Sequence, residues 1–161
     1  MVKLSQVNKT VFVLAHNIRS LYNVGSIFRG ADALGVEKLY FSGYTGTPPD
    51  QRISKVALGA EDYVSWEKVS SPARLITKLR KNIPGLQVIA LENNVKFPIK
   101  KLHEFQAYFP LLLVVGEETI GIPQPVLKKC DHIIEIPMVG QKESLNVSVA
   151  LGIAIYYLKN S

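Results

Sequence analysis

The sequence lacks several features that mark particular classes of protein. It contains one cysteine, Cys130, which excludes an intramolecular disulfide and favours a reducing compartment. No apolar run approaches the roughly 20 residues that are needed to span a bilayer. Residues 1–6 do not combine a charged region with a long apolar core, as a secretory signal would. We therefore expect a cytoplasmic protein that does not enter a membrane.

Two further absences bear on which cofactors the protein could bind. The three histidines, His16, His103 and His132, and the single cysteine show no spacing typical of metal ligands, so we predict no metal site. No Gly-x-Gly-x-x-Gly follows the first predicted strand, so the fingerprint of a dinucleotide site is missing. The chain also lacks internal repeats, and 161 residues are the length of one domain, which we expect to span 1–161.

Positive charge, by contrast, is in excess. The chain has 19 lysines and arginines against 13 aspartates and glutamates, which gives a formal net charge of +6. Such a balance favours a polyanionic partner, because binding releases the counterions that surround it. Charge alone does not identify that partner.

Short apolar runs alternate with helical patterns along the whole chain. Each run is typical of a buried strand of a parallel sheet. The predicted strands are residues 11–15, 38–41, 86–91, 111–115 and 133–136, with a sixth near 63–66. This alternation predicts an α/β domain with a mostly parallel sheet flanked by helices.

Polar residues precede two of the predicted helices. Asn23 is a candidate cap for a helix over 24–34. Ser144 or Asn146 is a candidate cap for the helix over 147–158, which is apolar nearly all round. We expect that helix to be buried on more than one side, partly against another chain. At Ser144 and Asn146 a plain helix cap and an active-site role both remain open.

Arginines lie on both sides of the predicted start of the first helix. Arg19 precedes it and Arg29 lies one to two turns inside it. Helix N-termini at the edge of an α/β sheet attract anions, and two arginines there could clamp a phosphate. The alternative is that both are solvated surface charges.

Three segments, in order, resemble the motifs of the SpoU/TrmH-type RNA methyltransferases of the SPOUT superfamily. The matching positions are Asn17, Arg19, Asn23, Gly25 and Arg29 in the first motif, Gly116, Glu118 and Gly121 in the second, and residues 136–138 and 144–150 in the third. The resemblance extends over almost the whole chain, which is therefore identified as a member of that family.

The resemblance implies a SPOUT fold with a deep C-terminal trefoil knot, which periodicity alone does not reveal. It implies that S-adenosylmethionine is the cofactor and, together with the apolar helix over 147–158, that the chain forms a homodimer. The expected reaction is methylation of a ribose 2′-hydroxyl of RNA, with tRNA as first choice and rRNA as second. We expect no appended RNA-binding domain. A catalytically silent RNA-binding protein or a base methyltransferase of the same fold remain alternatives.

The resemblance also assigns roles to single residues. The candidate catalytic residues are Arg29, Asn23, Glu118, Ser144 and Asn146. The candidate cofactor-binding residues are Leu91, Gly116, Ile136, Met138, Ser144 and Leu145. The candidate RNA-binding residues are Asn17, Arg19 and Arg29 of the first motif, together with Tyr44 and Arg52, which come from the long loop over 42–51 and its end rather than from a motif. Plainer interpretations also exist: Glu118 could close a turn, and the loop over 42–51 could be a simple connection.

Two of these assignments carry a physical expectation. A guanidinium donates hydrogen bonds and has no acceptor, so we expect Arg29 to hold a phosphate or to stabilise a developing alkoxide rather than to act as a base. Gly116 has no side chain, and we expect this to let a ligand approach the backbone.

Overall fold

A seven-stranded sheet forms the centre of the computed structural model, which describes residues 8–93 and 95–161. The segment 1–6, for which no secretory signal is predicted, lies outside the described residues. The strands are β1 (Val11–His16), β2 (Lys38–Ser42), β3 (Trp66–Lys68), β4 (Gln87–Leu91), β5 (Lys100–Lys101), β6 (Leu111–Val115) and β7 (His132–Glu135). Their order is β3-β2-β1-β6-β4-β7-β5, and every pairing between them is parallel. The predicted α/β class is confirmed.

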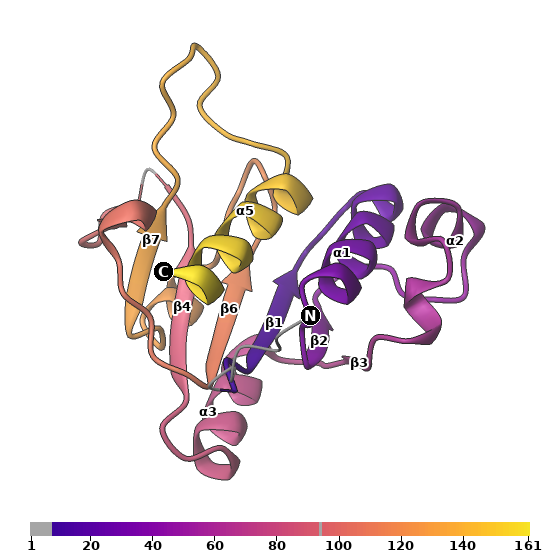
Figure 1. Ribbon diagram of the computed structural model, residues 1–161, viewed down its shortest axis with the longest axis horizontal. Helices are drawn as coiled ribbons and strands as arrows, with labels where there is room; N and C mark the ends of the chain where they lie inside the picture. Colours follow the sequence, from indigo (N-terminus) through magenta and orange to yellow (C-terminus); the bar gives the residue numbers. More distant parts are fainter. Residues whose placement is uncertain (1–7, 94) are drawn as a thin grey trace, which may run out of the picture.

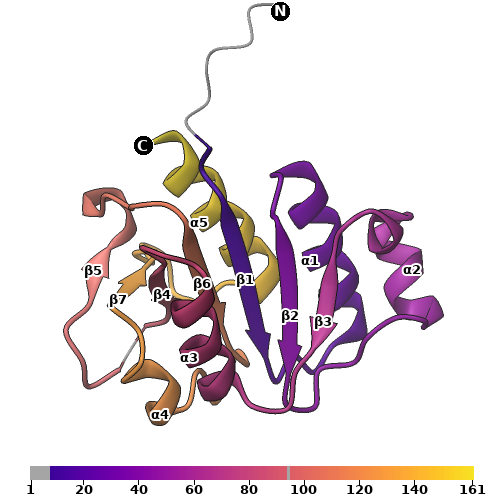
Figure 2. The ribbon, with the colours of Figure 1, turned by 90° about the horizontal axis from the view of Figure 1, so that it is seen from below.

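Helices cover both faces of the sheet (Figures 1 and 2). They are α1 (Leu21–Ala33), α2 (Gln51–Ala57), α3 (Pro72–Asn82), α4 (Gln124–Leu127) and α5 (Val147–Asn160), with short 3₁₀ turns at Ala60–Asp62 and Leu102–Glu104. One hydrophobic cluster joins the sheet to α1, α2 and α5, and a second joins it to α3 and α4. Among the described residues, no helix has the length and apolar character needed to cross a membrane.

Strand β1 shows why the predicted strands are apolar at every position. Val13 and Ala15 belong to the cluster beneath α1 and α5, whereas Leu14 between them belongs to the cluster beneath α3 and α4. Successive side chains of a strand point to opposite faces, so a sheet covered on both faces needs apolar residues throughout. This pattern is what made the strands visible in the sequence.

Several predicted boundaries are corrected by the structure. Ser20, not Asn23, caps α1: its side chain accepts a hydrogen bond from the backbone N–H of Asn23 at 3.2 Å, and the helix begins earlier than predicted. Strand β3 begins at Trp66, where the sequence placed the end of a strand over 63–66. Asn146 rather than Ser144 caps α5, since its side chain accepts from the N–H groups of Ser148 and Val149.

The order in which strands are added to the sheet changes sides at β1. The chain runs outward from β1 to β2 and β3, and the later strands add on the other side, beginning with β6. In open α/β sheets ligands bind outside the carboxyl ends of the strands at such a reversal. The loops after β1, β2, β4, β6 and β7 meet at this edge, and the functional site is therefore expected there.

Candidate functional site

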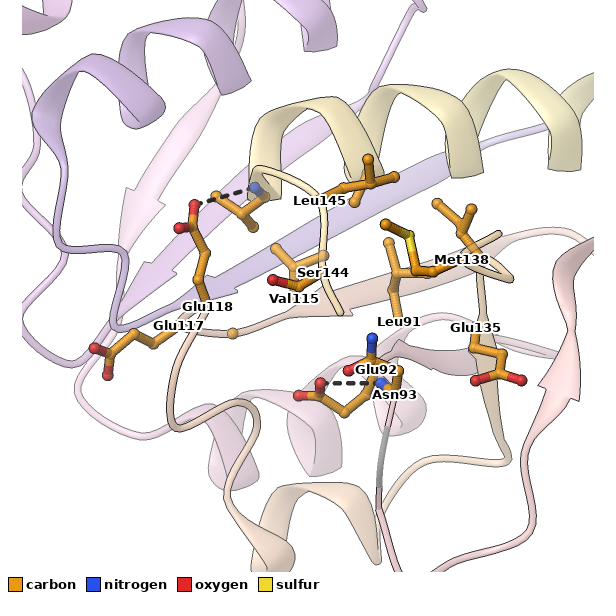
Figure 3. Close-up of a pocket in the computed structure, with 14 residues that line it drawn as sticks. Leu91, Glu92, Asn93, Val115, Glu117, Glu118, Glu135, Met138, Ser144 and Leu145 are labelled. Carbon is orange, nitrogen blue, oxygen red and sulfur yellow. Dashed lines mark hydrogen bonds between the residues drawn. The ribbon is translucent and has the colours of Figure 1, made fainter. Parts of the chain in front are cut away.

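A pocket opens at the carboxyl ends of β4, β6 and β7, beside the start of α5 (Figure 3). Its lining includes all six candidate cofactor-binding residues: Leu91, Gly116, Ile136, Met138, Ser144 and Leu145. These residues come from three loops that are far apart in the sequence, and the fold brings them around one hollow. What binds there stays a prediction.

Glu92 also lines this pocket, although the sequence motifs did not point to it. Its Oε1 accepts from the N–H of Asn93 at 3.0 Å, and its Oε2 accepts from the N–H of Ile122 at 2.9 Å. Asn93 in turn donates from Nδ2 to the carbonyl of Glu143 at 2.8 Å. These two residues tie the loops after β4, β6 and β7 together. The available signal was their place directly after a buried strand.

Gly116 is required by the packing of its own loop, and its expected role in letting a ligand approach stays a prediction. A Cβ at this position would lie 2.8 Å from the backbone carbonyl of Gly121 and 2.9 Å from the side chain of Ile122. Gly121 has a φ of +75°, and a Cβ there would come within 2.4 Å of the Glu92 carboxylate. The glycine at 116 therefore allows its own loop to fold back on itself, a requirement that holds before any ligand binds.

Three of the candidate catalytic residues meet in one cluster beside the pocket. Asn146 donates from Nδ2 to Oδ1 of Asn23 at 2.9 Å, and Asn23 donates from Nδ2 to Oε1 of Glu118 at 3.3 Å. The same Glu118 oxygen accepts from the N–H of Val147 at 3.2 Å, so the carboxylate also holds the first turn of α5. Ser144 lines the pocket next to this cluster.

Arg29 lies away from the cluster. It is exposed on α1, six residues after Asn23. In an α-helix six residues correspond to roughly 9 Å along the axis and a rotation of about 240°. The guanidinium therefore leaves the helix on another side than Asn23.

A second hollow adjoins the cluster on the side of α1. It is lined by Ile18, Arg19, Ser20, Asn23, Glu117, Glu118, Thr119 and Val147. Arg19, a candidate RNA-binding residue, lines this hollow and forms an ion pair with Glu117 at 3.4 Å. Two further candidates are linked to it through Glu117: Tyr44 donates to Glu117, and Asn17 accepts from the N–H of Tyr44 at 3.1 Å. Arg52, the remaining one on this side, is paired instead with Asp50, the cap of α2, at 3.0 Å.

Beneath these residues a buried polar network fixes the loop after β2. Nδ1 of His16 lies 2.8 Å from Oγ of Ser42, and Lys68 donates from Nζ to the carbonyls of Gly43, at 2.8 Å, and of Thr45. Burial lowers the pKa of His16 below its ordinary value, and the charge of Lys68 lowers it further. The imidazole is therefore held neutral under the loop that carries Tyr44.

Neither metal binding nor thiol chemistry is favoured by the described residues. Over 8–93 and 95–161 no group of three or more histidine, cysteine, aspartate or glutamate side chains could hold a metal ion. Burial raises the pKa of the Cys130 thiol to about 12, which keeps it protonated and unreactive at neutral pH.

Comparisons with known proteins agree with this geometry. The model of the SpoU rRNA Methylase family matches residues 10–156. A TrmH family protein of Staphylococcus aureus (strain COL) is 35% identical over 147 residues, which are 91% of this chain and 57% of the relative. The chain thus spans little more than half the length of the curated relatives that it matches.

Solved structures match nearly the whole chain. The TrmH/SpoU tRNA modifying enzyme of A. aeolicus is 31% identical with a TM-score of 0.82, over 96% of this chain and 76% of that one. The SpoU methyltransferase AviRb of Streptomyces viridochromogenes, in complex with the cofactor AdoMet, is 26% identical with a TM-score of 0.84, over 94% and 57%. A structure described for 2-OH methylation of C/U34 on tRNA is 25% identical with a TM-score of 0.80, over 93% and 94%.

Proposed function

This chain belongs to the SpoU rRNA Methylase family, and from that premise we propose that it transfers a methyl group from S-adenosylmethionine to a ribose 2′-hydroxyl of RNA. The observation that carries the proposal is the pocket at the ends of β4, β6 and β7, which adjoins the cluster of Asn23, Glu118 and Asn146. The AdoMet complex of AviRb, a protein of similar fold, supports the choice of cofactor.

The residues of the pocket fit such a ligand. Apolar side chains of Leu91, Met138 and Leu145 offer contact area, while Asn93 and Glu135 supply polar groups at its rim. S-adenosylmethionine, when bound, supplies a methyl group on a good leaving group. Asn23 and Asn146 would orient the ribose, since each carries an amide beside the pocket, and alignment of donor and acceptor is the main task in such a transfer.

A homodimer would complete the site. Arg29 lies outside the cluster of its own chain, and α5 presents an exposed apolar stripe of Val149, Ile153 and Tyr156, which are 49%, 42% and 64% exposed. These positions are four and three residues apart, so they share one face of the helix. We propose that a second copy covers this face together with α1, and that Arg29 acts on ribose or phosphate bound to the partner.

We propose tRNA as the substrate, with rRNA as the second choice. The solved structure described for C/U34 methylation on tRNA matches this chain over most of both lengths, which makes it the best supported guide to the substrate. The likeness to SpoU structures supports a trefoil knot in the C-terminal part, and the single cysteine supports a cytoplasmic location.

Mapping of 2′-O-methyl sites in total RNA, with and without the gene, tests the proposal. We expect one defined tRNA ribose site to disappear with the gene and to return when purified protein and S-adenosylmethionine are added. Loss of a base methylation instead would favour a base methyltransferase. An unchanged methylation pattern, with RNA binding retained, would favour a silent RNA-binding protein.

A further inference from the structure

Glu117 has no role in the proposed reaction, although it directly precedes Glu118. Figure 3 shows the two carboxylates pointing apart, Glu118 toward the start of α5 and Glu117 away from it. Resting on the proposed function, we propose that Glu117, Arg19 and Tyr44 form a clamp for an unpaired RNA base next to the nucleotide that is methylated. Tyr44 and Arg19 contact the RNA in this clamp, and Glu117 is a positioning residue that acts through them.

The contacts of Glu117 join three loops. Tyr44, after β2, donates from its hydroxyl to Oε2 at 2.7 Å, and Arg19, after β1, places Nη2 3.4 Å from Oε1. Thr119, from the loop of Glu117 itself, donates to Oε1 at 2.9 Å. Both carboxylate oxygens are therefore engaged. The hydrogen bond from Tyr44 lowers the pKa of Glu117, which keeps the carboxylate charged at neutral pH.

Glu117 is covered by the protein, whereas the two side chains that it restrains, Arg19 and Tyr44, are exposed. The side chain of Glu117 is 8% exposed, that of Arg19 is 79% exposed, and Tyr44 is 52% exposed. A covered carboxylate thus restrains two exposed groups from neighbouring loops. Restraining them before binding reduces the entropy that they would lose on contact with a ligand.

Tyr44 is held at a second point by Asn17. Asn17 has a φ of 55°, in the left-handed region that few residues other than glycine adopt, and its Oδ1 accepts from the N–H of Tyr44 at 3.1 Å. A Cβ at Gly43 would collide with this oxygen, at 1.7 Å, so the turn is shaped around the asparagine. Backbone and hydroxyl of Tyr44 are both fixed, and half of its surface is left to solvent.

A fixed aromatic ring beside a guanidinium fits a nucleobase. Unpaired bases stack on aromatic side chains and on arginine, whereas the base faces of a duplex are already covered by their neighbours. Arg19 and Glu117 line the same hollow as Asn23 and Glu118. A base in the clamp would therefore belong to a nucleotide adjacent to the one whose ribose reaches the cluster. Because Glu117 offsets the charge of Arg19, stacking rather than phosphate attraction should carry the affinity.

Binding of a short unstructured RNA oligonucleotide, followed by fluorescence anisotropy, tests the clamp. We expect Tyr44→Ala to weaken binding by about tenfold or more, in line with the loss of one stacked base, without changing the dependence of affinity on salt. Tyr44→Phe and Glu117→Gln both keep the aromatic ring at position 44 but weaken or remove its hydrogen bond to residue 117. Each should weaken binding by about threefold. Tyr63→Ala is the matched control, because Tyr63 is also exposed, at 81%, and lies outside the clamp.

Two further measurements separate positioning from folding. If Glu117 acts through Tyr44, the double variant Glu117→Gln/Tyr44→Phe should bind no more weakly than Glu117→Gln alone. Affinity for S-adenosylmethionine should be unchanged in Tyr44→Ala and Tyr44→Phe, because Tyr44 does not line the cofactor pocket. Affinity for an RNA duplex of the same sequence should be unchanged in every variant.

Three results would overturn the clamp: Tyr44→Ala binds like the wild type, the duplex loses as much affinity as the single strand, or the two substitutions add. Absence of single-strand binding by the wild-type protein would also overturn it. Methyl transfer to total RNA then decides separately whether the proposed function stands.

Discussion

The Nδ2 atom of Asn146 donates to Oδ1 of Asn23 at 2.9 Å and joins two positions that are 123 residues apart. The other amide atom of Asn146, Oδ1, accepts from the N–H of Ser148 at 3.0 Å and caps α5. The Asn146 side chain therefore caps α5 with its Oδ1 atom and binds Asn23, a residue of the first motif, with its Nδ2 atom. The cap and the active-site interpretation of this residue are compatible.

Substitutions at Asn146 should separate these two roles. Asn146→Asp keeps an oxygen that can cap α5 but loses the amide that donates to Asn23, so we expect stability close to wild type and a large loss of methyl transfer. Asn146→Ala removes both contacts and should also cost about 1 kcal/mol of folding free energy, the usual value of a cap. Denaturant titration and a methyl-transfer assay check the pair. Equal activity of Asn146→Asp and wild type would contradict the active-site role.

Arg29→Ala should reduce methyl transfer by orders of magnitude while leaving cofactor affinity nearly unchanged, because Arg29 lies on α1 and the pocket lies elsewhere. Arg29→Lys should restore little, since a point charge does not replace a planar fork of donors. Mixed dimers sharpen the test. Combining Arg29→Ala with Asn146→Ala chains should recover activity that neither variant has alone, if each site draws these residues from different copies. Failure to recover it would place the whole site within one chain.

The exposed stripe of α5 should govern association. Ile153→Asp or Tyr156→Asp places a charge on the face that we assign to the dimer, and we expect the wild-type dimer to become a monomer at micromolar concentration. Leu58→Asp is the matched control, because Leu58 is 66% exposed at the end of α2, away from that stripe. Sedimentation measures all three variants. A monomeric wild-type protein would refute the dimer.

The pocket should bind S-adenosylmethionine or its demethylated product without RNA and without added metal. Ala150→Phe should block this binding, because Ala150 lines the pocket from α5 and a phenylalanine ring there would fill it. Gly116→Val is unsuitable, since the collision with Gly121 would disturb the loop itself. Calorimetry should show binding to wild type and to Ala150→Ser, and none to Ala150→Phe. Metal-dependent binding would contradict the assignment.

Stability should fall on the acid side partly because of His16. Its pKa in the folded chain is below the ordinary 6.5, owing first to burial and then to Lys68, so the unfolded chain takes up the proton first. This contribution is fully present above pH 6.5 and is lost as the pH falls below it toward the folded pKa. The melting temperature of wild type should therefore drop more between about pH 7.5 and about pH 5.5 than that of His16→Gln. Parallel curves for the two proteins would show that His16 is not responsible.

The inner strands were predictable because helices cover both faces of the sheet there and these strands are therefore largely apolar. The edge strands β3 and β5 carry charged residues, and the pattern misplaced β3 and did not predict β5. Helix starts were also less predictable: Ser20 and Asn23 can both cap, and only the path of the chain after β1 decides that Ser20 does. The strand pairing that places β6 beside β1 also lies beyond local pattern. Sequence periodicity reports only on residues that are close along the chain. The order of strands in the sheet is set by pairing between segments that are distant in the sequence.

The same limit applies to the candidate site: the sequence identifies residues, but not the contacts that they make across the fold. Motif resemblance named six residues as cofactor-binding, and all six line the pocket, but it did not name Glu92 or Asn93 and gave no partner for any residue. Glu117 and Glu118 are neighbours in the sequence, and no spacing argument could tell that one reaches Tyr44 and the other Asn23. That difference arises from loops contributed by other strands.

The contacts of Gly116, Gly121 and Glu92 have a consequence for redesign of this pocket. A side chain at Gly116 meets backbone and one at Gly121 meets the Glu92 carboxylate at a positive φ, so a library that randomises 116 or 121 singly should be strongly enriched in glycine among folded clones, most of all at 116. The loop between β7 and α5, which gives Met138, Ser144 and Leu145 to the pocket, is less constrained: Val139 is fully exposed, and a Cβ at Gly140 would meet nothing within 4 Å. Selection for an altered cofactor, such as one with a larger transferable group, should therefore find its changes between β7 and α5.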